Sequence, residues 1–216
     1  MSVQIESIQV GPLGENVYIV QSGDTTFIVD PGDEAEKILR FLQTIETTPQ
    51  FIVLTHGHLD HSSGLPYLLT QWKGALPRIA IHSLDAAYLG AAGEATNRKL
   101  FEGLRAMPYF RHAWKDLPEP DLLLAEGDSI PGTNFSVLHT PGHSAGSICL
   151  YSPDDAVLIS GDTLFRDGMG RTDGPDSDYW TLRESLQKLS RLPPETRVYP
   201  GHGPSTTIGR ELGGSI

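Results

Sequence analysis

Cysteine is nearly absent from this sequence of 216 residues, in which Cys149 is the single example. One cysteine cannot form an intrachain disulfide, and we therefore expect a reducing compartment such as the cytoplasm. The start of the sequence also lacks the basic segment and apolar core of a secretory signal peptide. No apolar run approaches the roughly 18 residues that a membrane span requires. These absences favour a soluble, cytoplasmic protein that has no membrane partner.

Basic residues are few as well. The 16 lysines and arginines are outnumbered by 27 aspartates and glutamates, which gives a formal net charge of -11. Because recognition of phosphates requires a basic face, we expect no nucleic-acid partner. A chain of this length, with 38% hydrophobic residues, can bury one substantial core but hardly two. We therefore expect a single domain over residues 1–216.

Short apolar segments separated by Gly, Pro and Asp predict an α/β (α+β) fold that is rich in strands. Strands are expected at residues 3–10, 17–20, 26–29, 51–54, 78–81, 121–124, 134–139, 147–151, 156–160 and 198–199. Helices are expected at residues 34–46, 66–72, 84–89, 98–107 and 179–189. Two strand-rich halves with external helices fit a four-layer sandwich, in which two mixed β-sheets lie face to face. Residues 91–120 are less regular, with an interruption expected at Pro108, and we expect a lid or a variable insertion there.

Residue types that bind metals are concentrated in one stretch, Thr55-His56-Gly57-His58-Leu59-Asp60-His61. It follows the apolar segment Phe51–Leu54, so its side chains lie at the end of a predicted strand. Three imidazoles and a carboxylate so close together are ligands that zinc and other transition metals prefer. Two more histidines, His143 and His202, follow Pro-Gly pairs in loops, and Asp162 ends a predicted strand. The sequence therefore predicts a metal site built from several loops.

These motifs, together with Asn16-Val-Tyr and Asp30-Pro-Gly, resemble those of the metallo-β-lactamase-fold hydrolases. The resemblance implies the four-layer αβ/βα sandwich of that family and two divalent metal ions, with zinc expected first and iron or manganese as alternatives. It also implies seven ligands: His56, His58 and His143 for one ion, Asp60, His61 and His202 for the other, and Asp162 as the bridge. Asp60 and Asp162 are expected to take part in catalysis. Because such ions lower the pKa of bound water to about 7, the expected reaction is a hydrolysis by a metal-bound hydroxide.

Two further stretches resemble the glyoxalase II and persulfide dioxygenase branch of that family. The first runs from Gly161 through Arg171 to Asp173, and the second from Tyr199 to Glu211. The likeness implies a glyoxalase II-like thioesterase, that is, a hydroxyacylglutathione hydrolase that cleaves thioesters such as S-lactoylglutathione. A mononuclear-iron persulfide dioxygenase and a lactonase or esterase of the same fold remain alternatives. Glyoxalase II also has a C-terminal helical region that helps to hold glutathione. Only residues 203–216 follow His202 here, so we expect glutathione to be held by residues 91–120 or by a partner subunit in a homodimer.

Four residues outside the seven ligands receive roles at this stage. Arg171 and Arg166 are candidates to bind a substrate carboxylate, although for Arg171 the residues favour an ion pair with Asp173 within the loop over that role. Asp30 is expected either to orient a metal ligand or to shape a turn. His139 is expected to be hydrogen-bonded, either as part of the scaffold or in support of a ligand.

Overall fold

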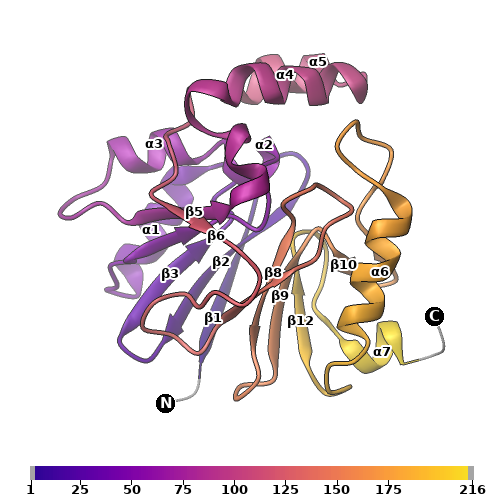
Figure 1. Ribbon diagram of the computed structural model, residues 1–216. Coiled ribbons are helices and arrows are strands. Elements are labelled where there is room, and N and C mark those ends of the chain that lie inside the picture. Colours follow the sequence, from indigo (N-terminus) through magenta and orange to yellow (C-terminus); the bar gives the residue numbers. More distant parts are fainter. Residues whose placement is uncertain (1–2, 214–216) are drawn as a thin grey trace.

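The computed structural model describes residues 3–213, whose strands form two mixed β-sheets (Figure 1). The first sheet has the spatial order β1 (Gln4–Val10), β2 (Glu15–Ser22), β3 (Thr25–Val29), β4 (Phe51–Val53), β5 (Arg78–His82) and β6 (Leu122–Leu124). The second has the order β13 (Thr206–Thr207), β12 (Arg197–Pro200), β9 (Val157–Gly161), β8 (Ile148–Ser152) and β7 (Ser136–His139). Pairing is antiparallel from β1 to β3 and parallel from β3 to β6. In the second sheet only β12 and β9 are parallel. Both sheets are therefore mixed, as expected.

Alternation along the strands assigns side chains to different layers, because successive strand residues point to opposite faces of a sheet. In β2, Tyr18 and Val20 face the second sheet, whereas Val17 and Ile19 face the helices outside the first. In β8, Leu150 lies between the sheets, whereas Cys149 lies on the outer side. The molecule thus has one apolar layer between the sheets and one beneath each outer set of helices, which confirms the four-layer sandwich.

Helices cover the outer face of each sheet (Figure 1). The helical segments are α1 (Ala35–Thr44), α2 (Leu59–Ser62), α3 (Leu65–Thr70), the 3-10 helices η1 (Ser83–Tyr88) and η2 (Gly90–Ala92), α4 (Gly93–Gly103), α5 (Met107–Ala113), α6 (Tyr179–Leu189) and α7 (Ile208–Leu212). Ile38 of α1 and Leu68 of α3 pack outside the first sheet, and Leu186 of α6 and Ile208 of α7 outside the second. Within residues 3–213, no helix is long and apolar enough to cross a membrane.

The structure corrects the expectation for residues 91–120. This segment is not irregular but contains the helices α4 and α5, which lie together across one end of the sandwich (Figure 1). Pro108 does not interrupt a helix, because it lies in the first turn of α5. Backbone N–H groups in a first turn have no acceptor within the helix, so proline, which lacks an N–H, breaks no hydrogen bond there. Leu100, Phe101 and Phe110 from these helices are buried in the outer core of the first sheet. The segment therefore contributes side chains to the core of that layer.

Several short elements also depart from the sequence prediction. The residues expected to form a helix at 84–89 form the 3-10 helix η1 instead. Helix α7, the edge strand β13 and the hairpin of β10 (Leu164–Phe165) with β11 (Gly168–Met169) were not predicted. All three are short, and their sequences are too brief to show a helical or strand period.

The topology brings the predicted ligands to one edge of the sandwich. His56 follows β4, Asp162 follows β9 and His202 follows β12, each at the carboxyl end of a strand with a parallel neighbour. Asn16 and Tyr18 of β2 join the two sheets at this edge, because both side chains donate hydrogen bonds to the Pro200 carbonyl, at 3.0 and 2.7 Å. Loops that are distant in sequence therefore meet between the two sheets.

Candidate metal centre

Six of the seven predicted ligands form two compact groups. The first ligand group is His56, His58 and His143, and the second ligand group is Asp60, His61 and His202; within each, the candidate ligand atoms lie within 4.8 Å of one another. Helix α2 contributes to the second group, because its first turn places Asp60 and His61 next to each other. Six side chains from three separate loops are thus arranged as two sites for small cations.

Asp162 lies between the two groups. Its Oδ1 is 3.3 Å from Nε2 of His61, and its Oδ2 is 3.6 Å from Nε2 of His143 and 3.7 Å from Nε2 of His202. A backbone constraint fixes this position, since a side chain on Gly201 would overlap the Asp162 carboxylate. Asp162 is therefore placed where one carboxylate can serve two cations.

The histidine rings are oriented by hydrogen bonds on the nitrogen that faces away from the centre. Nδ1 of His61 lies 2.9 Å from Asp30 Oδ2, Nδ1 of His143 lies 2.9 Å from the Arg171 carbonyl, and Nδ1 of His202 lies 3.2 Å from the Leu13 carbonyl. Each partner can only accept, which assigns the proton to Nδ1. Nε2 of these rings is therefore left as a free electron pair that points toward the other ligands.

Buried atoms without partners show that the two groups fit cations. Among the described residues, Nε2 of His56, His58, His61 and His143 and Oδ1 of Asp162 are buried and have no hydrogen-bond partner. Buried polar atoms are rarely left unpaired in folded proteins, because each unpaired group costs about 1–3 kcal/mol. Five such atoms converge in one place, which is an arrangement that divalent metal ions would satisfy. Nitrogen and carboxylate donors of this kind are compatible with zinc, iron and manganese.

In the metal-free protein the protonation states of His56, His143 and Asp162 suit metal binding. For His61, burial is outweighed by the surrounding carboxylates of Asp162, Asp60 and Asp30, which raise its pKa, and a metal ion would displace its proton. Burial, together with the neighbouring rings of His61 and His58, holds the pKa of His56 well below its ordinary value. Burial and His58 lower the pKa of His143 to about 4. Burial alone would raise the pKa of Asp162, but the adjacent His61 outweighs it and holds that pKa below its ordinary value. Neutral imidazoles and an ionised carboxylate are the forms in which these side chains bind cations.

Asp30 supports the second ligand group from behind. Its Oδ2 accepts from Nδ1 of His61, and its carboxylate also accepts from the backbone N–H and the hydroxyl of Thr55, at 2.7 and 2.6 Å. The Asp30 side chain is buried, and its backbone is in the left-handed region, with φ of 52°. Asp30 therefore both orients a ligand and forms the turn after β3, so the two expectations for it are not exclusive.

Asp85 performs a similar task for the first ligand group and was missed by the sequence analysis. Its carboxylate accepts hydrogen bonds from the Gly57 N–H at 3.0 Å, from the Ser144 hydroxyl at 2.7 Å and from the Gly146 N–H at 2.6 Å. It thereby ties the loop of His56 and His58 to the loop of His143. An aspartate in a short helix carries no sequence signal for this role.

His139 is hydrogen-bonded, as expected, and its contacts fit the scaffold alternative of that expectation. Its Nε2 is 2.9 Å from the Ala145 carbonyl, and its ring stacks on His82 with centroids 4.1 Å apart. These two residues end strands of opposite sheets, β5 and β7. The pair therefore helps to join the two sheets and belongs to the scaffold.

The stacked pair predicts a pH-dependent stability. Burial, and then the neighbouring His139, lower the pKa of His82 below its unfolded value of 6.5. The unfolded chain therefore takes up a proton more readily than the folded one, so this contribution to stability is present above pH 6.5 and is lost as the pH falls. The free energy of unfolding is measured in urea at about pH 7.5 and at about pH 5.5. From the higher to the lower pH it should decrease less in His82→Phe than in the wild type. The ligand histidines contribute equally to the pH dependence of both proteins, so their contribution cancels in the comparison. An equal decrease in the two proteins would contradict the prediction.

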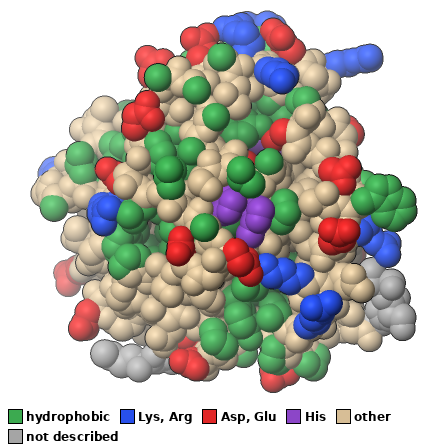
Figure 2. All heavy atoms as spheres, in the orientation of Figure 1, with side chains coloured by type: hydrophobic (Ala, Val, Ile, Leu, Met, Phe, Trp, Pro, Cys, Tyr) green, Lys and Arg blue, Asp and Glu red, His purple; other side chains and the backbone are tan. Residues whose placement is uncertain are grey.

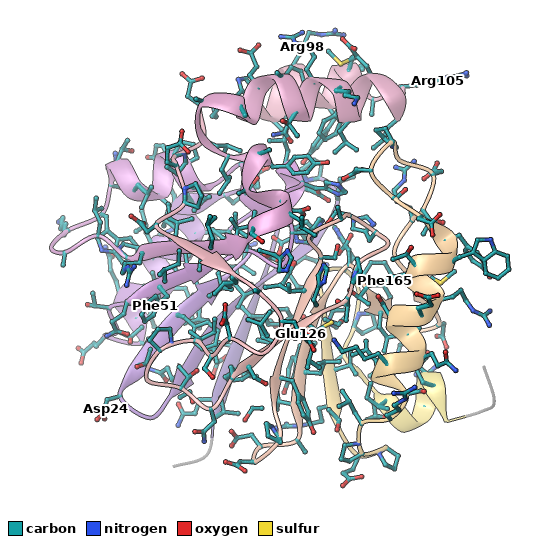
Figure 3. All side chains as sticks on the ribbon, in the orientation of Figure 1. Asp24, Phe51, Arg98, Arg105, Glu126 and Phe165 are labelled. Carbon is teal, nitrogen blue, oxygen red and sulfur yellow. The ribbon has the colours of Figure 1, made fainter. Side chains whose placement is uncertain are left out.

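The two candidate arginines lie outside the ligand groups. Arg171 makes a bidentate ion pair with Asp173, at 2.7 and 2.9 Å, and its side chain is 55% exposed. Arg166 follows Phe165 in the β10–β11 hairpin and lines a surface pocket of about 340 Å³ with Arg197 and Arg210. In the same hairpin, the Phe165 ring, labelled in Figure 3, meets the ring of the candidate ligand His202 edge-on, with centroids 6.1 Å apart. Arg171 is thus already paired and Arg166 lines a separate pocket, so neither is assigned to substrate by its position.

Two side chains of the second ligand group are accessible to solvent. His202 and Asp60 in the second ligand group have side chains that are 23% and 18% exposed, whereas His61 is fully buried. On the face drawn in Figure 2, basic side chains are interspersed with acidic ones. A small molecule therefore approaches the second ligand group most readily.

Comparison with known proteins agrees with this geometry. Residues 10–202 match the family described as the metallo-beta-lactamase superfamily. The hydroxyacylglutathione hydrolase GloC of Haemophilus influenzae is 33% identical, over 97% of this chain and 95% of that protein. Among solved structures, TTHA1623 in a di-iron-bound form is 39% identical with a TM-score of 0.78, over 95% of this chain and 96% of that one. The BLEG-1 B3 metallo-beta-lactamase is 34% identical with a TM-score of 0.81, over 97% of both chains. This chain therefore belongs to the metallo-beta-lactamase superfamily.

Proposed function

We propose that this protein is a two-metal hydrolase that cleaves thioesters of the hydroxyacylglutathione type. The observation that carries the proposal is the pair of ligand groups with Asp162 between them. Membership of a superfamily of metal-dependent hydrolases supports an enzymatic role. The similarity to GloC supports the thioester substrate. Zinc as the resident ion and the cytoplasm as the compartment are part of the same proposal.

The two ligand groups and Asp60 have different roles in the proposed reaction. Two divalent ions, when bound, would supply a hydroxide at neutral pH and would polarise the thioester carbonyl. The first and second ligand groups would hold these ions, with the Asp162 carboxylate between them. Asp60 faces His202, with Oδ2 3.3 Å from its Nε2, and is partly exposed. Its carboxylate can therefore accept a hydrogen bond from the attacking nucleophile and orient it toward a substrate.

A covalent mechanism through the cysteine is not favoured. Cys149 is fully buried on the outer side of β8, between the sheet and α6. Burial raises the pKa of its thiol to about 11, so little thiolate exists at neutral pH. The reaction proposed here needs no protein nucleophile, because water is activated at the metal centre.

The alternatives of a lactonase or esterase and of a mononuclear-iron persulfide dioxygenase are distinguished by a substrate panel. We expect the metal-loaded protein to hydrolyse S-lactoylglutathione faster than a lactone, a simple ester or a penicillin, with release of free thiol measured by a thiol reagent. A thioester of a small neutral thiol shows whether the glutathione part contributes. Oxygen uptake with glutathione persulfide, in the absence of thioester hydrolysis, would refute the proposal in favour of the dioxygenase.

A further inference from the structure

Asp176 is an acidic residue beside the first ligand group that no sequence motif singles out. Its Oδ2 lies 3.5 Å from Nε2 of His58. Its other oxygen, Oδ1, is buried and has no hydrogen-bond partner among the described residues, and the same is true of Nε2 of His58. The Asp176 carboxylate therefore lies beside a candidate metal ligand, and each of the two side chains keeps a buried polar atom without a partner.

Tyr88 holds this carboxylate in place. Its buried hydroxyl donates a hydrogen bond to Oδ2 of Asp176, and its ring meets the His58 ring edge-on at 5.5 Å. A side chain on Gly57 would overlap the Tyr88 ring, so the tyrosine packs directly on the backbone between two metal ligands. The position of Asp176 is therefore coupled to that of His58 through a rigid aromatic contact.

The loop that contains Asp176 is anchored at both ends to the loop of His143. The Arg171 carbonyl accepts from Nδ1 of His143 at 2.9 Å, and the Asp178 N–H donates to the Gly142 carbonyl at 2.8 Å. Asp178 also caps α6, because its carboxylate accepts from the Thr181 N–H at 2.7 Å. The fold therefore positions Asp176 as firmly as it positions the ligands themselves.

We propose that Asp176 is an acidic residue beside the first ligand group. It strengthens the binding of a cation by that group without being one of the group's three ligands. This proposal rests on the two-metal centre proposed above. The three ligands of that group are neutral, so an adjacent carboxylate compensates the charge of a dication more directly than any of them. Asp176 is not among the three residues whose candidate ligand atoms lie within 4.8 Å of one another, so it would act on the cation through its charge and through its contact with His58.

A metal titration tests the proposal without reference to activity. Metal-free protein is titrated with Co²⁺ in competition with a chromophoric chelator. We expect Asp176→Asn to bind one of two equivalents about 10–100-fold more weakly than the wild type, which is the usual effect of losing a partner that supports a metal ligand. Tyr88→Phe should show a smaller loss, since the carboxylate remains. Asp173→Asn, in the same loop but 68% exposed and paired with Arg171, is the matched control and should keep the wild-type affinities.

The outcomes separate this proposal from the one on which it rests. Wild-type affinities for both equivalents in Asp176→Asn would overturn the role of Asp176 and leave the two-metal centre intact. If the wild type binds a single ion, the two-metal centre fails, and the role of Asp176 is supported or refuted by whether the variant weakens that ion. A wild type that binds none refutes both. Thermal unfolding of the metal-free proteins checks the fold, and if Asp176→Asn is unfolded, Tyr88→Phe decides, because it removes only a hydroxyl.

Discussion

Replacement of Asp162 by alanine is expected to lower the rate of hydrolysis on the order of 10³-fold, because a metal ion contributes several kcal/mol to such a reaction. Asp162 lies within 3.7 Å of histidines from both ligand groups. Without its carboxylate, each group loses an anionic donor and the separation of two cations is no longer fixed. The measurement is kcat/KM for S-lactoylglutathione, together with the metal content of the variant, which should fall below that of the wild type.

The matched control for Asp162→Ala is Asp154→Ala. Asp154 is an exposed aspartate in the turn between β8 and β9, at the other end of the strand that Asp162 follows. Its replacement removes the same charge and should leave both the rate and the metal content unchanged. Full activity in Asp162→Ala with both ions retained would show that the carboxylate does not join the two ligand groups.

Replacement of Asp30 by alanine should have the largest effect on stability, with a loss of about 3–5 kcal/mol in the free energy of unfolding. The buried carboxylate accepts from the Thr55 N–H, the Thr55 hydroxyl and Nδ1 of His61, and all three donors would be left unpaired. Alanine also tolerates the left-handed backbone at this position poorly. Urea unfolding of the metal-free proteins measures the loss.

Two further variants show which property of Asp30 matters. Asp30→Asn keeps the shape of the side chain and tolerates the left-handed backbone. Its NH₂ group would face N–H or O–H donors of Thr55 and His61, so the variant should lose metal affinity and part of its stability. Asp24→Ala, in the exposed β2–β3 turn labelled in Figure 3, is the control and should be neutral within about 0.5 kcal/mol. Equal stability and metal affinity of Asp30→Asn and the wild type would show that Asp30 only forms a turn.

Local pattern predicted much of the fold, because each strand carries an apolar segment bounded by turn residues. It did not predict which apolar layer a side chain would join, since this depends on how the two sheets pack. In residues 91–120 the pattern misled, because Pro108 was interpreted as a helix breaker although the first turn of a helix accepts proline. Elements as short as β13 and α7 depend on tertiary contacts and carry little local signal.

The ligand residues could be predicted because metal binding requires particular side chains at loop positions with a recognisable spacing. The residues that support them could not. Asp85, Tyr88 and Asp176 come from segments with no such motif and reach the centre only through packing between loops that are distant in sequence. Common residue types in ordinary contexts acquire these roles from the fold. The stacking of His82 on His139 is a similar case, since the two rings come from different sheets.

The metal content of the purified protein is the most direct test of the two-metal centre. Elemental analysis, combined with an accurate protein concentration, should give about two transition-metal ions per chain, one for each ligand group. The same preparation should hydrolyse S-lactoylglutathione and lose this activity when a chelator removes the ions. A single iron per chain, with oxygen consumed on addition of glutathione persulfide, would contradict the account and identify the protein as a dioxygenase.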